Sequence, residues 1–134
     1  MIKITRFHAF LPVALTMLGC ATKPSGMTFD SPLGEWSETY ETYSGSTRTS
    51  RFIIVDETLG TYPGGQVQFF ATEDPYHWKG YWINEEGKQA CEQKKDDSPY
   101  WGVMTYNFNE TYNRYNGTWD QCGEGRNWPI SGLR

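Results

Sequence analysis

Histidine is scarce in this 134-residue chain, which has two, and only His77 lies beyond residue 20. There is no HExxH, no CxxC and no pair of histidines at ligand spacing, so the sequence predicts no metal site. It also has no GxxxxGK[ST], and no GxGxxG that follows a strand, so it predicts no nucleotide or other cofactor. A Ser-His-Asp or Cys-His site would have to be built around His77, and a lone histidine beside a tryptophan is usually a packing or solvent-facing residue. We therefore expect no catalytic residues and no enzyme activity, with a hydrolase that pairs two acids as the third alternative.

Long apolar runs are also missing, because no stretch reaches the roughly 20 residues that a membrane-spanning helix needs. Residues 7–18 are mostly apolar, follow the basic residues Lys3 and Arg6, and end at Gly19. A charged start, an apolar middle and a small residue at the end are the layout of a secretory signal. The sequence therefore predicts a signal peptide over residues 1–19, and the alternative is a buried N-terminal helix or a membrane anchor.

Residues 15–20, LTMLGC, resemble the lipobox of bacterial lipoproteins, with Met17 where leucine is usual. In that class the signal is cut before the cysteine, which is acylated (palmitate is one such chain) and becomes the mature N-terminus. The resemblance implies that Cys20 anchors the chain to a membrane, since several acyl chains bind firmly where a single one is marginal. Ala21 replaces the aspartate that retains many such proteins in the inner membrane, which implies an outer-membrane lipoprotein of the cell envelope, on a face that the sequence leaves open. Residues 20–31 are small and polar and are expected to be the lipidated N-terminus and linker.

From Pro32 onward no stretch has helical periodicity. Short runs rich in aromatic and β-branched residues alternate with clusters of Gly, Pro, Asn and Asp. The sequence predicts an all-β domain over 32–134, a small antiparallel up-and-down barrel of about eight strands, because closing the sheet removes its edges. A sandwich is the alternative, and residues 56–65, DETLGTYPGG, leave room for a further short strand. Strands are expected at 35–43, 50–55, 66–71, 77–84, 88–94, 100–108, 113–121 and 127–133.

Two segments place a glycine between aromatic residues, WKGYW at 78–82 and YNGTW at 115–119. Because alternate residues of a strand share a face, each glycine leaves a notch that a neighbouring ring or backbone can fill. This aromatic-x-Gly-x-Trp motif resembles the core of the MORN repeat, but the distance between its copies in the sequence excludes tandem repeats. Gly34-Glu35-Trp36 resembles the Gly-x-Trp motif of the lipocalin and avidin superfamily. That resemblance implies a barrel with the tryptophan closing one end and a basic residue, Arg134 or Arg126, packed over it.

Cysteine is limited to three residues, so one is left over in an exported chain. Once Cys20 carries lipid, Cys91 and Cys122 form the expected disulfide, worth roughly 3 kcal/mol for a loop of about 30 residues. Two buried free thiols are the alternative. In the expected strand order the two cysteines lie two strands apart, nearly 10 Å at about 4.8 Å per strand, which is too far for a disulfide. The bridge therefore requires a tight curl, or a fold-back at Cys122 that Gly123 and Gly125 permit.

Charge and aromatic content suggest the partner. Without Lys3 and Arg6, the chain has 10 basic and 16 acidic residues, and this net charge near −6 disfavours nucleic acid as a partner.

All six tryptophans follow Cys20, and they either fill the interior or line a groove. We expect a non-catalytic envelope binding module for a glycan, a small apolar molecule or a protein; the alternative is an inhibitor or immunity-type protein that blocks a partner. A hollow barrel favours a ligand, and a filled barrel with a protruding loop favours a protein. The candidate binding residues crowd next to turns: Tyr76, Trp78, Tyr81, Tyr100, Trp101 and Tyr112, with Asn113, Arg114 and Asn116 adding polar groups.

Overall fold

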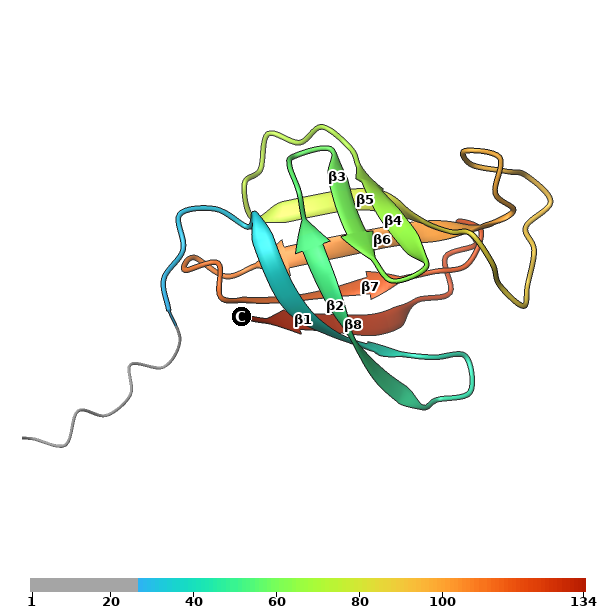
Figure 1. Cartoon of the computed structure of the whole chain (residues 1–134), viewed down its shortest axis with the longest axis horizontal. Coiled ribbons are helices and arrows are strands. Elements are labelled where there is room, and N and C mark those ends of the chain that lie inside the picture. Colours follow the sequence, from blue (N-terminus) through green and yellow to red (C-terminus); the bar gives the residue numbers. More distant parts are fainter. Residues whose placement is uncertain (1–26) are drawn as a thin grey trace, which may run out of the picture.

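The computed structural model describes residues 27–134, and the expected signal peptide, Cys20 and most of the expected linker lie outside them. The described chain is a closed barrel of antiparallel strands, in which each strand pairs with the next and β8 pairs back with β1 (Figure 1). The expected all-β up-and-down barrel of eight strands is confirmed. The strands are β1 (Gly34–Glu41), β2 (Thr47–Ile54), β3 (Leu59–Tyr62), β4 (Gly65–Phe69), β5 (His77–Asn84), β6 (Tyr100–Phe108), β7 (Arg114–Trp119) and β8 (Trp128–Leu133).

One expected strand is wrong, and one short strand replaces it. Residues 88–94 belong to a loop, 85–99, that joins β5 to β6 and contains a single isolated bridge, between Lys95 and Ser98. The chain bends at Lys88, Gln89, Glu92 and Gln93, so 88–94 is not extended. It then turns at Asp96 and Asp97, which have φ of 46° and 62°. The missing strand is β3, which lies inside the 56–65 stretch and pairs with β4. The count of eight is therefore right although one member differs.

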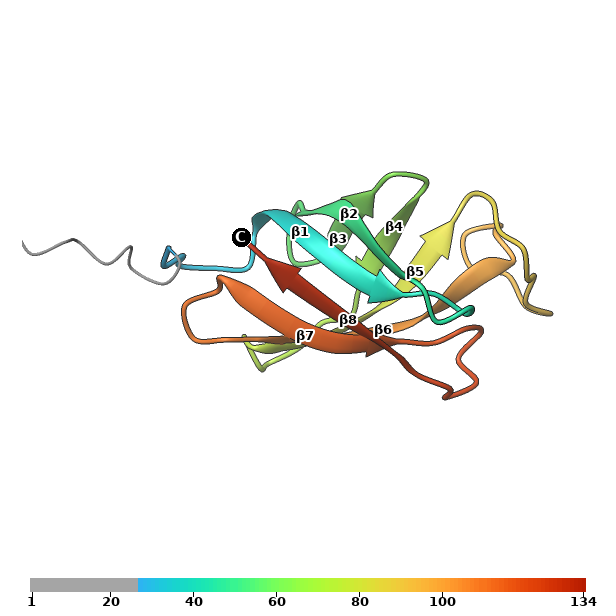
Figure 2. The ribbon, with the colours of Figure 1, turned by 90° about the horizontal axis from the view of Figure 1, so that it is seen from below.

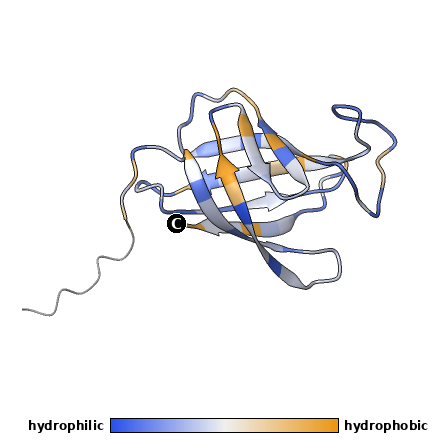
Figure 3. Ribbon diagram, viewed as in Figure 1, coloured by the Kyte–Doolittle hydropathy of each residue, from blue (hydrophilic) through white to orange (hydrophobic). Residues whose placement is uncertain are grey.

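The interior of the barrel is filled by side chains. Tyr106 is fully buried and stacks on Phe52 and Phe108, at ring-centroid distances of 5.7 and 6.1 Å. Trp78 meets Phe108 edge-on at 5.5 Å. Most strands are pale in Figure 3, because the hydropathy index places Tyr and Trp near the middle of its scale, and the strongest orange lies on β2. The buried core is Trp36, Phe52, Ile54, Val67, Phe69, Trp78, Trp82, Met104, Tyr106, Phe108, Tyr112, Tyr115, Trp119 and Ile130.

The glycines between aromatic residues allow close approach of the neighbouring strand. A Cβ atom on Gly117 would lie 1.8 Å from the backbone oxygen of Thr105, and one on Gly80 would lie 2.5 Å from that of Gln68. Neither contact is sterically possible, so only glycine fits. The notch predicted from the sequence is confirmed, and the adjacent backbone fills it.

Arg134 closes the end of the barrel at which the described chain begins and finishes. Its guanidinium carbon lies 4.2 Å from the ring centroid of Trp36 and 3.8 Å from that of Phe29. It donates hydrogen bonds to the backbone oxygens of Ser31, Leu33 and Tyr112. Arg134, and not Arg126, is therefore the basic residue over Trp36. Figures 1 and 2 both show the C-terminus beside the start of β1, and we call this the N-terminal end of the barrel.

The opposite end, which we call the disulfide end, carries the connections β1–β2, β3–β4, β5–β6 and β7–β8. The long 85–99 loop extends beyond the strands there (Figure 1). The first described residues, from Met27, lie at the other end, where Phe29 donates its backbone N–H to the oxygen of Thr111. The disulfide end therefore carries the long 85–99 loop, and the N-terminal end carries the first described residues.

Candidate functional site

A disulfide joins Cys91 to Cys122, with 5.5 Å between their Cα atoms. The backbone N–H of Cys91 donates to the oxygen of Pro99, and that of Cys122 donates to the oxygen of Trp101, so both cysteines lie beside the start of β6. Cys122 has a φ of 58°, and Gly123 continues the reversal at 70°. The predicted pairing and the fold-back are confirmed. The distance problem disappears because Cys91 is in a loop and not in a strand of its own.

The 85–99 loop packs on the outer wall of the barrel and forms a second small core. Cys91, Ile83 and Trp101 are buried together there. The indole N–H of Trp101 donates to the backbone oxygen of Gln93 at 2.8 Å. The ammonium of Lys95 lies 4.6 Å from the Tyr81 ring centroid and 4.9 Å from that of Trp101. These contacts and the disulfide hold the 85–99 loop in place. The loop has no strand pairing of its own beyond the isolated β-bridge between Lys95 and Ser98.

A pocket of about 320 Å³ opens at the disulfide end, where the β1–β2, β5–β6 and β7–β8 connections meet. Trp119 and Trp128 are register partners across β7 and β8, and their rings stack at 4.6 Å. Tyr43 stands nearly perpendicular to both, at 5.1 and 4.9 Å. The pocket is lined by Tyr43, Gln89, Gln121, Glu124, Arg126 and Trp128.

The polar side chains of this pocket make few bonds with one another. The amide nitrogen of Gln121 donates to the backbone oxygen of Gln89 at 2.9 Å. The amide oxygen of Gln121 is buried and has no hydrogen-bond partner within the described chain. Arg126 lies over Trp128, 5.0 Å from its centroid, and no carboxylate of residues 27–134 is within ion-pair distance of it. An aromatic corner is therefore surrounded by donors and acceptors that remain free to bind something else.

Asp120 shapes the β7–β8 connection that supplies half of this pocket. Its carboxylate is buried and accepts backbone N–H bonds from Val103 at 2.7 Å, Gly123 at 3.2 Å and Gly125 at 3.1 Å. The negative charge of Asp120 and, more strongly, burial raise the pKa of Tyr43 to about 12. Asp120 is thus fully engaged in holding the turn, and Tyr43 stays neutral.

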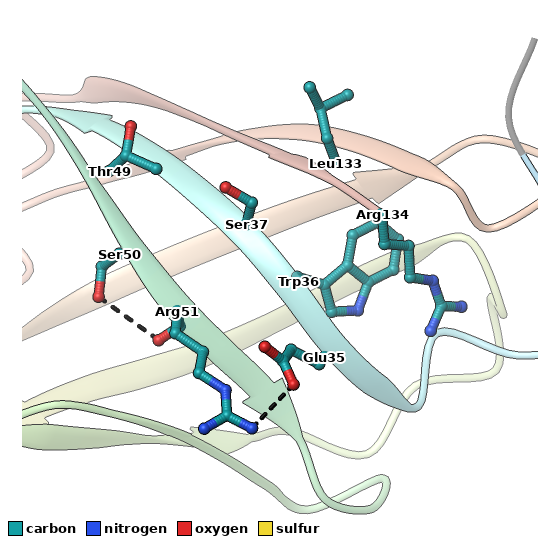
Figure 4. Close-up of a pocket in the computed structure, with 8 residues that line it drawn as sticks. All are labelled: Glu35, Trp36, Ser37, Thr49, Ser50, Arg51, Leu133 and Arg134. Carbon is teal, nitrogen blue, oxygen red and sulfur yellow. Dashed lines mark hydrogen bonds and ion pairs between the residues drawn. The ribbon is translucent and has the colours of Figure 1, made fainter.

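A second pocket, of about 350 Å³, lies on the outer wall of β1 and β2 and is shown in Figure 4. Its prominent contact is an ion pair of 2.8 Å between Arg51 and Glu35, both well exposed. Exposed pairs of this kind contribute little to stability or recognition. Figure 4 shows Ser37 and Thr49 on the same wall, with no aromatic ring facing outward among them. This hollow lacks the features of a binding site.

The buried carboxyl of Glu38 is the main polar group inside the barrel. It is 6% exposed, and the hydroxyl of Tyr115 donates to its Oε2 at 2.5 Å. Burial raises the pKa of Glu38 to about 7, and the bond from Tyr115 opposes that rise. The pKa of Tyr106, whose hydroxyl donates to the sulfur of Met104, is also raised by burial and by the nearby Glu38. Within residues 27–134 the side-chain hydrogen-bond partner of this carboxyl is the hydroxyl of Tyr115, and no second carboxyl shares a hydrogen bond with it.

The candidate aromatic residues from the sequence do not form one site. Trp78 points into the core. Tyr76 and Tyr112 stack at 5.2 Å at the N-terminal end, where the Tyr112 hydroxyl donates to the oxygen of Pro75. Tyr81 and Trp101 meet on the outer wall at 5.6 Å, beneath Lys95. Three of the six, Trp78, Trp101 and Tyr112, are therefore buried, and the six are spread over the core, the N-terminal end and the outer wall.

The remaining candidates also lie apart. Tyr100 is half-buried beside Gly87, where a Cβ atom would meet its ring at 2.8 Å. Arg114 and Asn116 are exposed on β7, and Asn113 is buried in the β6–β7 turn, where it accepts from Asn109 at 2.6 Å. The sequence analysis missed Tyr43, Gln121, Arg126 and Trp128. The register that sets Trp119 opposite Trp128 comes from the structure, and the nearest signal in the sequence is that both tryptophans flank the turn between 113–121 and 127–133.

His77 is the first residue of β5 and is exposed at the N-terminal end of the barrel. Its Nδ1 is 2.7 Å from the carboxylate of Asp74, and both side chains are at least half exposed. The bond to the Tyr76 backbone N–H and then the bond to His77 lower the pKa of Asp74. Within residues 27–134 no group of three or more His, Cys, Asp or Glu could hold a metal ion. The same part of the chain contains no helix with the length and hydropathy to cross a membrane.

The fold and the site together describe a small, filled up-and-down barrel with a disulfide-braced aromatic pocket at one end. No family model matches the chain, and no solved structure matches it. Its sequence is similar to bacteriocin lactococcin-B of Lactococcus lactis subsp. cremoris, with 34% identity over 61 residues. The match covers 45% of this chain and 87% of the bacteriocin. The chain therefore belongs to the family of that bacteriocin, through a segment that makes up less than half of its own length.

Proposed function

We propose that this chain is a lipid-anchored, non-catalytic binding module of the bacterial cell envelope, and that it binds its partner with the disulfide end of the barrel. The filled interior carries this proposal. Because rings in contact occupy the barrel from Trp36 to Tyr106, a ligand has no room inside, and recognition takes place on the exterior.

The arrangement of the two ends supports the same conclusion. The described chain begins at the N-terminal end, so an acyl group on Cys20 tethers that end to the membrane. The pocket and the 85–99 loop are at the opposite end and face away from the tether. A linker of about a dozen residues spans at most about 40 Å when fully extended, which leaves the disulfide end free to reach a partner. The absence of Asp after Cys20 supports the outer membrane as the location.

A second candidate is an inhibitor or immunity-type protein that blocks a partner protein. The observation that favours it is the protruding loop, whose Glu85, Glu86, Lys88, Glu92 and Lys94 are all exposed around a covalent anchor at Cys91. Braced loops of this kind bind with less entropy loss than free ones. The family relation to a bacteriocin supports a role outside the cytoplasm for either candidate.

The experiment compares two half-buried aromatic residues at opposite ends. The mature chain, made soluble by Cys20→Ser, is incubated separately with isolated cell-wall glycan and with detergent-solubilised envelope proteins. We expect one of the two fractions to retain it, and Trp128→Ala to weaken retention at least about tenfold. The matched control is Tyr76→Ala at the N-terminal end, which should leave retention unchanged. No retention by either fraction, or equal loss in both variants, contradicts the proposal.

A further inference from the structure

We propose that the pocket at the disulfide end binds a single pyranose ring of a neutral sugar. This inference rests on the proposed function and specifies the ligand class of that same end. The aromatic rings of Tyr43 and Trp128 form a corner in this pocket. Tyr43 and Trp128 meet at 80° and 4.9 Å, so they offer two walls at nearly a right angle. The C–H face of a pyranose packs on one such wall while its edge meets the other.

The rings of Tyr43 and Trp128 are held in place by their neighbours, which favours binding of a ligand between them. Trp128 is backed by Trp119 at 4.6 Å, and the indole N–H of Trp119 donates to the backbone oxygen of Glu41 at 3.0 Å. The ring of Trp128 is therefore fixed from behind, and Tyr43 is fixed edge-on against both tryptophans. Aromatic anchors held in place before binding cost little entropy when a ligand arrives.

The polar groups fit hydroxyls at the rim of such a ring. Glu124 supplies acceptors and Arg126 supplies donors, and both side chains are exposed without an ion-pair partner in residues 27–134. One acid and one base balance each other, so the pocket favours a neutral ligand over an ion. The buried amide oxygen of Gln121 lacks a donor within residues 27–134, and an unsatisfied buried acceptor destabilises the free protein. A small rotation of this amide toward a sugar hydroxyl removes that destabilisation.

Size and covalent bracing complete the argument. A volume of about 320 Å³ is at the lower limit of ligand pockets and suits one ring, with the rest of a chain outside. Gln89 and Gln121 each lie within two residues of a disulfide cysteine. The bridge therefore fixes the distance between the two loops that form the pocket floor.

The test titrates the mature Cys20→Ser chain with tetramers of N-acetylglucosamine and of glucose, and with both monomers, while tryptophan fluorescence and calorimetry are recorded. We expect at least one tetramer to bind and to shift the emission. Arg126→Ala and Gln121→Ala should each weaken binding at least about tenfold. Gln93→Ala, which alters an exposed glutamine of the 85–99 loop outside the pocket, is the control and should bind normally. Thermal melting of each variant separates a lost contact from a lost fold.

The arms distinguish the sources of the sugar. Equal affinity for monomer and tetramer indicates a free sugar, whereas binding of the tetramer alone indicates a glycan chain. Failure of all four sugars to bind, or binding that the pocket variants leave unchanged, overturns the inference. If envelope proteins retain this chain, Trp128→Ala weakens that retention and no sugar binds, the proposed function stands and the sugar inference alone is wrong.

Discussion

The hydroxyl of Tyr115 on β7 donates a hydrogen bond of 2.5 Å to the buried carboxyl of Glu38 on β1, across the intervening strand β8. Gly132 of β8 is the register partner of both residues. A Cβ atom on Gly132 would lie 2.0 Å from the Tyr115 ring, so the absence of a side chain lets that ring lie over β8. Three strands thus cooperate to satisfy one carboxyl in an otherwise apolar interior.

The first prediction concerns the pH dependence of folding. The folded pKa of Glu38 is about 7, above its ordinary value of 4.5, so the folded protein binds more protons than the unfolded chain between these values. The free energy of unfolding should therefore be highest below pH 4.5 as far as Glu38 contributes, and should fall by about 3 kcal/mol as the pH rises to 7. Denaturant unfolding of Glu38→Gln should lack this decline. An identical decline in the variant assigns it to other groups.

The second prediction is that Gly132→Ala destabilises the barrel by about 3 kcal/mol, because the added methyl group overlaps the Tyr115 ring. Ser131→Ala, on the exposed side of the same strand, should change stability by less than about 0.5 kcal/mol. Chemical denaturation measures both variants. Equal stability of Gly132→Ala and the parent would mean that Tyr115 can move without loss.

The third prediction concerns the disulfide. Replacing both Cys91 and Cys122 by serine should lower the free energy of unfolding by about 3 kcal/mol, because the unfolded chain gains freedom. The barrel should persist, since its ladder is continuous without the 85–99 loop. Trp101 should become more exposed, because Cys91 covers it in the second core. Near-ultraviolet circular dichroism and acrylamide quenching record both effects, and complete unfolding of the variant contradicts the separation of loop and barrel.

The fourth prediction compares two arginines that lie over tryptophans. Arg134→Ala should cost about 2 kcal/mol, because three backbone oxygens and two aromatic rings lose their partner. Arg126→Ala should be nearly neutral for stability, since Arg126 is exposed and contacts a single ring. Thermal unfolding of the two variants is the measurement. Equal losses in both would show that Arg134 does not close the barrel.

The fifth prediction tests the anchor. Cys20→Ser should move the protein from the membrane fraction to the soluble fraction, or leave its signal peptide uncut, because no acyl chain can be attached. Cell fractionation and mass spectrometry of the N-terminus measure the outcome. A wild-type chain that is wholly soluble and retains residues 1–19 removes the lipoprotein hypothesis.

The sequence by itself predicted the closed antiparallel barrel and seven of its eight strands. Alternation of aromatic residues with polar ones places Tyr115, Gly117 and Trp119 on one face, and two-residue periodicity follows directly from strand geometry. The pairing of Cys91 with Cys122 followed from counting, because the expectation that Cys20 carries lipid leaves two of the three cysteines to pair. These features depend on local geometry and on residue identity, which a sequence displays.

Only the tertiary structure decided where the ends of the strands meet. The interpretation of 88–94 as a strand failed because the disulfide to Cys122 and the packing of Cys91 on Ile83 and Trp101 outweigh local β-propensity. The pocket joins Tyr43, Gln89 and Gln121, which lie on three separate connections, so no short motif contains it. Glu38 lies on the inner face with Trp36, and its buried carboxyl is satisfied by the hydroxyl of Tyr115, 77 residues away in the sequence. Contacts of this range depend on the closure and register of the whole barrel, and not on any local pattern.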